Sequence, residues 1–361
     1  MTLPAPAPNQ TTVDEALAAF FGAACRAFEQ AARPSHERTY TVGPYALRLW
    51  FANDRLAPRL TPALEHLAAP VNDLGGTTAL TVYVWDSAST GVPMPPPPWP
   101  LDAYATRGDL RGQSTLRFQT AFQFTPAGVG VLSILDRDQA LGMYWLSDER
   151  HLPDYETGAP LRNLLHWGLA KVGYQFVHAG GVGRAEGGVL LVGKGGSGKS
   201  TAALACLEAG LFYLADDYCL LNTPPAPEAL SLYNSAKVRP DGLLRFPQLA
   251  RRVDARDRLG VEKAIFFLQR HFPERLILRF PVRAILIPRL TGLAATSLTP
   301  ASPATALKAL APSTLFQLAG AGPAAFQQLA SLIREVPCYY LEAGTDVHQI
   351  PGLIAALLPA A

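Results

Sequence analysis

The segment "GGVLLVGKGGSGKSTAALACLEAG", residues 187–210, decides how the rest of the chain is interpreted. The apolar run VLLV predicts a buried strand, and the alanine-rich run after the loop predicts a helix that ends at Gly210. Between them, "GKGGSGKST" fits the phosphate-loop pattern G-x-x-x-x-G-K-[ST]. Because this loop stands between a strand and a helix, the sequence predicts a binding site for ATP or GTP.

The residue types of this loop match the chemistry of a nucleotide's phosphates. Glycines let successive backbone N–H groups turn inward around phosphate oxygens. Lys199 would place a positive charge at the β- and γ-phosphates, and the Ser200 hydroxyl would coordinate Mg²⁺. The helix beginning at Lys199 would direct its positive N-terminal end at the same oxygens. The candidate nucleotide-binding residues are therefore Gly193, Lys194, Gly195, Gly196, Ser197, Gly198, Lys199, Ser200 and Thr201.

Two adjacent carboxylates follow the next predicted strand, in "GLFYLADDYCLL". A right-handed crossover makes this strand parallel to VLLV, and parallel strands end at the same edge of a sheet, where ligands collect. Asp216 and Asp217 should therefore lie beside the phosphate loop. Neighbouring strand residues face opposite ways, so we expect one carboxylate to hold Mg²⁺ and the other to accept a proton from a hydroxyl. The sequence does not assign these roles. We take Asp216, with Ser200, as a candidate metal ligand.

A histidine precedes the loop, at the end of the predicted strand "YQFVH", residues 174–178. If this strand pairs with the VLLV strand, the His178 imidazole would reach the catalytic edge. The candidate catalytic residues are His178, Lys199, Asp216 and Asp217.

The same loop also contains "KGGSGKST", the variant loop of partitioning-type ATPases, which are dimerising switches. Lys194 supports that alternative, since the variant loop uses a lysine there across a dimer interface. Two features oppose it: the loop lies far from the N-terminus, and the carboxylates are adjacent instead of forming D-x-D. A third alternative is a scaffold that binds nucleotide and transfers nothing.

The chain has two regions of different pattern. Thr12-Val13-Asp14-Glu15 has capping-box spacing and predicts the start of an amphipathic helix whose buried face includes Phe20, Phe21, Cys25 and Phe28. Five short alternating segments between residues 39 and 147 then predict strands. From about residue 151, helices and strands alternate, which predicts an α/β domain. We therefore expect a β-rich N-terminal domain at residues 1–150 and a phosphate-loop domain at residues 151–361.

Several segments of the chain, its net charge and its cysteine spacing indicate which classes of function are disfavoured. "GVPMPPPPWP", residues 91–100, predicts a rigid connector, and residues 1–11 predict a flexible tail. The formal net charge is +2, without a basic arm, which disfavours nucleic acid as a partner. The four cysteines have no metal-site spacing. No signal peptide or membrane-spanning run is present, so we expect a cytoplasmic protein that does not bind membranes. The sequence leaves homo-oligomerisation open.

Taken in order, these features resemble one family. Their order is similar to that in the HPr kinase/phosphorylase superfamily: a histidine, a glycine-flanked strand, G-x-x-G-S-G-K-S-T, a helix ending in glycine and then "YLADD". "VYVWDSASTGVPMPPPPW", "SLYNSAKV" and "VRAILIPRL" resemble its serine-kinase-like subgroup, found near genes for peptide natural products. The resemblance covers roughly residues 160–350, and the N-terminal region more loosely.

The resemblance implies a phosphate-loop kinase domain whose fold is related to phosphoenolpyruvate carboxykinase. It implies ATP and Mg²⁺ as cofactors, and transfer of a phosphoryl group to a hydroxyl, such as that of Ser, in a peptide, protein or small molecule. Lys199, Ser200, Asp216, Asp217 and His178 match the family's site positions. The chain departs from the family in "SLYNSAKVRP", which lacks the expected Glu and offers Asn234, Ser235 or Lys237 instead. This departure argues against phosphorylase activity. The family's basic C-terminal loop is also not recognisable, which argues against HPr as the acceptor.

Overall fold

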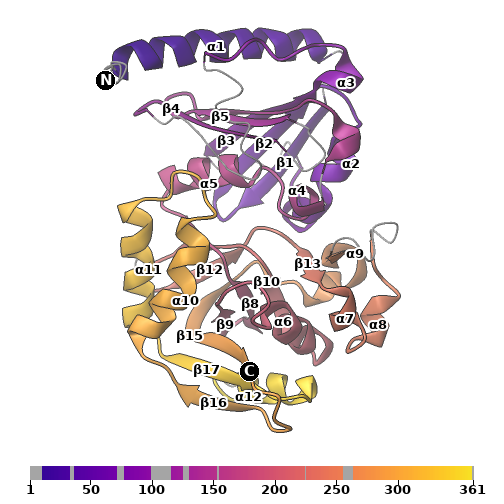
Figure 1. The fold of residues 1–361 in the computed structure, drawn as a ribbon, viewed down its shortest axis with the longest axis vertical. Coiled ribbons are helices and arrows are strands. Elements are labelled where there is room, and N and C mark those ends of the chain that lie inside the picture. The colour runs from indigo at the N-terminus through magenta and orange to yellow at the C-terminus, as the bar shows by residue number, and fades with distance from the viewer. Residues whose placement is uncertain are drawn as a thin grey trace, which may run out of the picture. The chain divides into compact units, whose positions relative to one another are not determined.

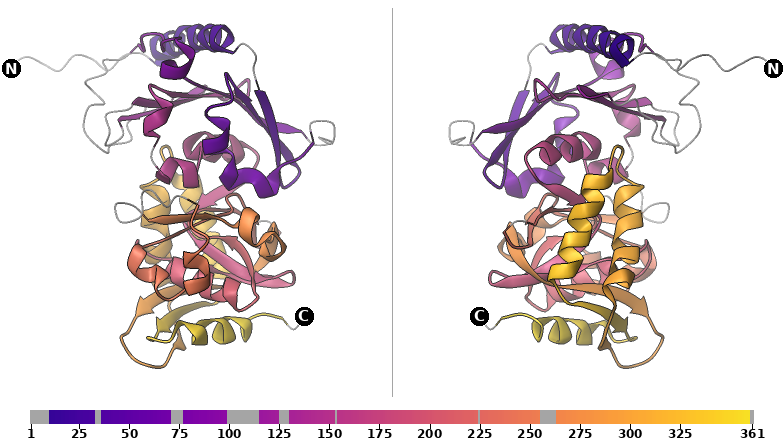
Figure 2. Two further views of the ribbon diagram at one scale, coloured as in Figure 1. Left: turned by 90° about the vertical axis from the view of Figure 1, so that its right-hand side faces the viewer. Right: turned by 90° about the vertical axis from the view of Figure 1, so that its left-hand side faces the viewer.

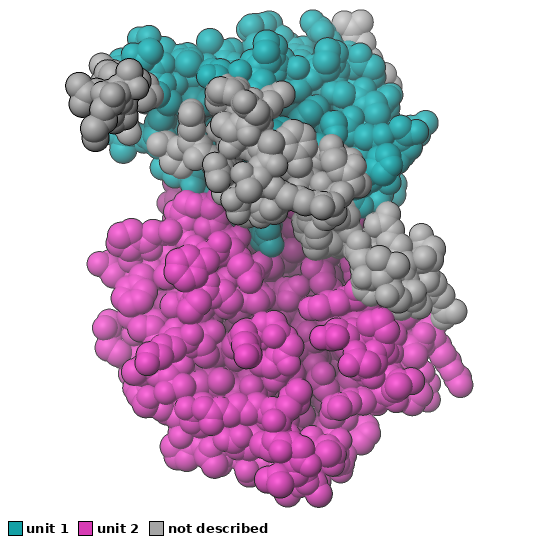
Figure 3. Space-filling view, in the orientation of Figure 1, with its two compact units in different colours: residues 1–59, 69–153, 161–169 teal, residues 60–68, 154–160, 170–361 magenta. Residues whose placement is uncertain are grey.

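The computed structural model describes residues 10–32, 36–70, 77–98, 115–124, 130–152, 154–223, 225–254 and 263–359. Residues 1–9 of the predicted flexible tail, and Trp99 and Pro100 at the end of the predicted connector, lie outside these ranges. The chain forms two compact units (Figure 3). Unit 1 comprises Met1–Arg59, Ala69–Pro153 and Leu161–Leu169, and unit 2 comprises Leu60–Ala68, Asp154–Pro160 and Ala170–Ala361. The main change of unit falls at residues 153–154. Residues 60–68 belong to unit 2 although their sequence neighbours on both sides lie in unit 1, and residues 161–169 belong to unit 1 although their neighbours lie in unit 2.

Unit 1 is built on a six-stranded sheet with the order β1-β2-β3-β6-β5-β4. Its strands coincide with the alternating segments of the sequence: β1 His36–Val42, β2 Tyr45–Phe51, β3 Thr78–Asp86, β4 Phe118–Phe124, β5 Gly130–Asp136 and β6 Leu141–Leu146. Its helical segments are α1 Gln10–Ala31, α3 Ser87–Thr90, η4 Glu149–His151 and most of α5 Arg162–Lys171. Residues 91–98 of the proline-rich segment form neither helix nor strand.

Helix α1 packs along this sheet (Figure 1). Phe20, Phe21 and Phe28 are buried in one cluster with Trp85, and Cys25 is half-buried beside them. Phe28 stacks on Tyr83 with ring centroids 4.3 Å apart. The predicted helix start at Thr12 is wrong, because the helix already includes Gln10. The capping-box spacing at residues 12–15 therefore lies inside the first turns and caps nothing.

Unit 2 is built on a nine-stranded sheet with the order β10-β8-β9-β15-β12-β11-β7, where β17 also pairs with β15 and β16 with β17. The strands are β7 Gln175–Val177, β8 Gly180–Arg184, β9 Gly187–Leu191, β10 Phe212–Ala215, β11 Cys219–Asn222, β12 Glu228–Ser231, β15 Arg279–Leu290, β16 Ser297–Pro300 and β17 Cys338–Ala343. A separate pair consists of β13 Ser235–Val238 and β14 Ala264–Phe267. The molecule is thus a mixed α/β protein.

Helices cover both faces of the large sheet, which explains why its central strands are apolar throughout. Val189 and Leu191 belong to one core cluster with residues of α6 and α12. Leu190 and Val192 belong to another, with residues of α10 and α11. Helices α10 and α11 lie side by side in two views (Figures 1 and 2).

The helical segments of unit 2 are η1 Pro62–Leu67, α4 Asp154–Gly158, α6 Lys199–Glu208, α7 Pro240–Leu243, α8 Pro247–Ala250, α9 Leu268–His271, η6 Pro273–Arg275, α10 Pro303–Leu315, α11 Pro323–Glu335, η7 Val347–Gln349 and α12 Ile350–Ala355. Helix α2, Ala57–Leu60, spans the change of unit.

Two strand relationships matter for the site. β10 runs in the same direction as β9, as predicted, but β8 lies between them and pairs antiparallel with both. The pairing of the "YQFVH" strand with the VLLV strand, which was the condition for His178 to reach the site, does not occur, because β7 pairs with β11. Among the described residues, no helix is long and apolar enough to cross a membrane.

Candidate active site

The predicted phosphate loop connects the end of β9 to the start of α6. Gly193, Gly196 and Gly198 have φ angles of 140°, 81° and 104°, a backbone region that residues with a β-carbon rarely adopt. Gly198 is the N-cap of α6, so the first N–H groups of this helix have no partner within it. The glycines thus fold this sequence into a loop beside the positive end of a helix.

Lys199 folds back over the loop that precedes it. Its side chain is buried, and Nζ donates a hydrogen bond to the Gly193 carbonyl oxygen at 2.6 Å. Burial lowers the pKa of Lys199, while the charges of Asp216 and Asp217 act in the opposite direction. A phosphate in the loop would offer this ammonium a stronger partner than a carbonyl oxygen. Lys194 in the same loop is exposed.

The two carboxylates after β10 meet different surroundings. Asp216 is 2% exposed, and its Oδ2 accepts a hydrogen bond from the Lys237 backbone N–H at 2.8 Å. Its Oδ1 is buried and has no hydrogen-bond partner among the described residues. Burial raises the pKa of Asp216 and the charge of Asp217 raises it further, while the Ser200 hydroxyl and the Lys237 N–H partly offset this. Asp216 therefore lies next to the loop and the Ser200 hydroxyl, with a buried Oδ1 that accepts no hydrogen bond of normal geometry from the described residues.

Asp217 is more accessible and carries two basic neighbours. Its side chain is 26% exposed, Oδ2 lies 3.2 Å from Lys237 Nζ, and Oδ1 lies 3.7 Å from His178 Nε2. Burial acts to raise the pKa of Asp217, but Lys237 and His178 outweigh it and hold the pKa well below its usual range. Asp217 is thus a partly exposed carboxylate held between two basic side chains.

His178 reaches the site by a different route from the predicted one. The β7–β11 ladder pairs Val177 with Cys219, so the residues just beyond this pair, His178 and Tyr218, are neighbours. Their ring centroids are 5.2 Å apart. The Thr314 hydroxyl oxygen accepts a hydrogen bond from the His178 backbone N–H at 3.1 Å. β11 therefore brings His178 beside Asp217, with no need for β9.

Lys237 was offered by the sequence only as one of three possible replacements for the family's Glu, and without a partner. It lies on β13, with its side chain 10% exposed. A β-carbon on Gly158 would lie 2.4 Å from Lys237 Cε, so the lysine stem packs directly against this glycine. The available signal was a single lysine inside the otherwise apolar or small run "SAKV". A buried lysine needs a negative partner, and the partner is Asp217.

Asn234 and Ser235, the other two residues offered in place of the family's Glu, make hydrogen bonds that hold the fold together. Asn234 is fully buried, and its Nδ2 donates to the Pro62 carbonyl oxygen at 2.8 Å. The Ser235 hydroxyl donates to the Gly158 carbonyl oxygen. These contacts attach β13 to neighbouring segments of unit 2, and so they support Lys237 without entering the site.

The residues present fit Mg²⁺ held partly by phosphates. No group of three or more His, Cys, Asp or Glu side chains suited to a metal occurs among the described residues. The buried Oδ1 of Asp216 lies on a carboxylate that also has the Ser200 hydroxyl as a neighbour. One carboxylate and one hydroxyl, completed by phosphate oxygens and water, are a usual protein contribution to a magnesium site.

No protein-family model matches the chain, and no curated protein sequence does so either. Among solved structures, the chain is similar to the Hpr(Ser) kinase/phosphatase from Coxiella burnetii. The identity is 15%, the match covers 51% of this chain and 93% of that chain, and the TM-score is 0.28. A similarity this low establishes neither the fold nor the function of this chain.

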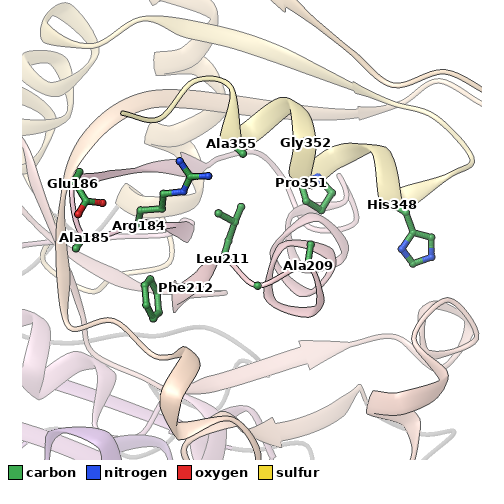
Figure 4. A pocket seen from close by; sticks show the side chains of 11 residues that line it. Arg184, Ala185, Glu186, Ala209, Leu211, Phe212, His348, Pro351, Gly352 and Ala355 are labelled. Carbon is green, nitrogen blue, oxygen red and sulfur yellow. The ribbon is translucent and has the colours of Figure 1, made fainter. Parts of the chain in front are cut away.

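A pocket of about 600 Å³ lies at the other end of α6 from the phosphate loop (Figure 4). Its lining includes Arg184, Ala209, Phe212, His348 and Pro351. The ten residues of α6 separate it from the loop by about 15 Å. This pocket is therefore distinct from the candidate active site.

Proposed function

We propose that the chain is an ATP-dependent phosphotransferase that moves the γ-phosphoryl group to a hydroxyl, such as a Ser side chain, of a peptide, protein or small molecule. The observation that carries this proposal is the environment of Asp217. A carboxylate that is partly exposed, oriented by Lys237 and His178, and adjacent to the metal-ligand candidate Asp216 suits an incoming hydroxyl.

In this proposal the loop amides and the N-terminus of α6 bind the phosphates. Lys199 Nζ exchanges the Gly193 carbonyl oxygen for oxygens of the β- and γ-phosphates. Ser200 and Asp216 would hold Mg²⁺, which when bound neutralises charge on the phosphate oxygens. These contacts position the γ-phosphorus and stabilise the charge on its oxygens. The protein forms no covalent bond to the phosphoryl group.

Asp217 then accepts a hydrogen bond from the acceptor hydroxyl and takes its proton as transfer proceeds. The hydroxyl oxygen forms a bond to the γ-phosphorus, the bond from this phosphorus to the bridging oxygen breaks, and ADP leaves. Lys237 keeps Asp217 ionised and fixes Oδ2, so that Oδ1 faces the acceptor. His178 stands beside Oδ1 and limits its rotation.

The test is incubation of the full chain with γ-labelled ATP, Mg²⁺ and a panel of hydroxyl acceptors, including serine-containing peptides. The proposal predicts labelled acceptor in a Mg²⁺-dependent reaction. Binding of ATP without a labelled acceptor in any reaction would favour the scaffold alternative.

A dimerising ATPase switch is the second candidate, and the exposure of Lys194 is the observation that favours it. An exposed lysine at this loop position can reach the nucleotide of a second copy. The Lys194→Ala variant separates the two functions. A switch would lose hydrolysis that depends on dimer formation, whereas a kinase would keep transferring phosphate to its acceptor.

A further inference from the structure

Leu290, the last residue of β15, lies near the phosphate loop, and a second exposed leucine, Leu293, follows three residues later. Leu290 is 63% exposed and Leu293 is 66% exposed. A β-carbon on Gly198 would lie 3.5 Å from Leu290 Cδ2 and 3.7 Å from Pro288 Cβ. The end of β15 therefore lies close to the N-cap of α6, where this helix begins.

The loop that carries these leucines is held firmly to the end of β17. Thr291 N–H donates to the Ala343 carbonyl oxygen at 3.1 Å, and Thr345 N–H donates to the Leu293 carbonyl oxygen at 2.8 Å. Gly344 N–H donates to the Thr296 hydroxyl at 3.0 Å. An apolar surface on an ordered loop binds a ligand at a lower entropic cost than one on a loose loop.

Arg289, the charged residue between Pro288 and Leu290, faces the opposite side of the sheet. Successive strand residues face opposite sides of a sheet, so Pro288 and Leu290 share the side that meets Gly198. Arg289 lies on the other side, with its guanidinium carbon 3.2 Å from the centroid of the Tyr340 ring and Nη1 3.5 Å from Glu342 Oε1. Leu290 is therefore presented to the loop without the adjacent arginine.

Different strands lie on the two sides of β9, the strand that leads into the phosphate loop. β15 is the parallel neighbour of β9 on one side, and β8 followed by β10 lies on the other. The β10 side carries Asp216 and Asp217 and suits the γ-phosphate and the acceptor. A nucleotide whose γ-phosphate lies on that side extends its ribose and base toward the β15 side, over the carboxyl ends of parallel strands.

We infer that Leu290 and Leu293 form an apolar platform for the purine base of the nucleotide. This inference rests on the proposed function, because the base is located relative to phosphates in the loop. A purine has flat, weakly polar faces, and nucleotide sites are commonly lined by apolar side chains with few polar groups. Neither leucine is needed for the fold, since both side chains are mostly in solvent.

The test compares two ligands by titration calorimetry in the presence of Mg²⁺. ATP carries the base, and inorganic tripolyphosphate carries only the phosphate chain. In a Leu290→Ser/Leu293→Ser double variant, ATP affinity should fall about ten-fold while tripolyphosphate affinity stays unchanged. The matched control is Leu278→Ser, which alters a leucine that is 55% exposed just before the other end of β15, about 40 Å along the strand. It should bind ATP as the unmodified chain does.

The outcomes separate this inference from the proposed function. If the double variant binds ATP normally, or if the unmodified chain binds tripolyphosphate as tightly as ATP, the platform does not contact the base. If neither ligand binds the unmodified chain, both the platform and the phosphotransferase proposal fail. Unchanged tripolyphosphate binding also reports that the double variant is folded.

Discussion

At the scale of single residues, the site depends on how two adjacent carboxylates are distinguished. Asp216 is buried against the Lys237 backbone, and Asp217 lies between the Lys237 ammonium and the His178 imidazole. One lysine therefore contacts both carboxylates, through its main chain and its side chain. This arrangement leaves one oxygen of Asp216 for a metal and one side of Asp217 for a hydroxyl.

Replacing Lys237 by Met should lower the turnover number for phosphotransfer about 100-fold, because Asp217 loses the cation that orients it. ATP affinity should change by less than about three-fold, since the loop does not depend on this side chain. Lys237→Arg should recover part of the rate, and Lys308→Met, at an exposed lysine of α10, should have no effect. Steady-state kinetics and ATP titrations check this. Equal losses of rate and ATP affinity would mean that Lys237 supports the fold instead.

At the scale of elements, local pattern predicted the longer helices and many of the strands, and long-range pairing was the part it missed. The strand before the loop, the helix after it and the strand ending in Ala215 follow from apolar runs and glycine punctuation. β8 was not predicted, because "GGVGR" is rich in glycine and has little strand propensity. The β7–β11 pairing joins residues far apart in sequence, which no local pattern encodes.

The same distinction applies to the candidate site. His178, Lys199, Asp216 and Asp217 could be nominated from motif order, because each follows or begins a recognisable element. Lys237 could not be assigned a partner, since its contact with Asp217 depends on where β13 lies in the fold. The contact between Leu290 and the N-cap of α6 depends in the same way on the β9–β15 pairing.

The glycines of β8 and β9 make space for one buried ring, which predicts an effect on stability. A β-carbon on Gly188 would lie 2.5 Å from the Phe280 ring, which is itself buried. Gly188→Ala should destabilise unit 2 by about 1 to 3 kcal/mol through overpacking. The control is Gly352→Ala in α12, where an added β-carbon would meet no atom within 4 Å beyond its chain neighbours and the helix's own backbone, and it should be neutral or stabilising. Urea denaturation followed by far-UV circular dichroism measures both, and equal midpoints would contradict the packing argument.

At the scale of the whole molecule, both units are expected to lose stability in acid, because each contains a buried histidine. In unit 2 this is His66, whose pKa burial lowers to about 3. His166 in unit 1 is buried, and burial together with Arg137 and Arg162 lowers its pKa to about 4. The unfolded chain protonates this histidine near pH 6.5, so its contribution is complete above that pH and is lost as the pH falls toward 4. The expected loss of unfolding free energy is roughly 3 kcal/mol.

Tryptophan fluorescence can follow this loss, because all five tryptophans fall within the sequence ranges of unit 1. Urea unfolding at pH 7 and pH 4.5 should show a smaller pH dependence for His166→Gln than for the unmodified chain. If both chains lose the same stability on acidification, His166 is not the group responsible.

The central claim is that a nucleotide bound by the loop donates its γ-phosphoryl group to a hydroxyl oriented by Asp217. Asp217→Asn tests it most directly, with ATP affinity and phosphotransfer measured on the same preparation. The account predicts unchanged ATP affinity and a turnover number lower by about 100-fold to 10,000-fold, because the loop is intact and the proton acceptor is lost. Phosphotransfer by Asp217→Asn at the rate of the unmodified chain would contradict it.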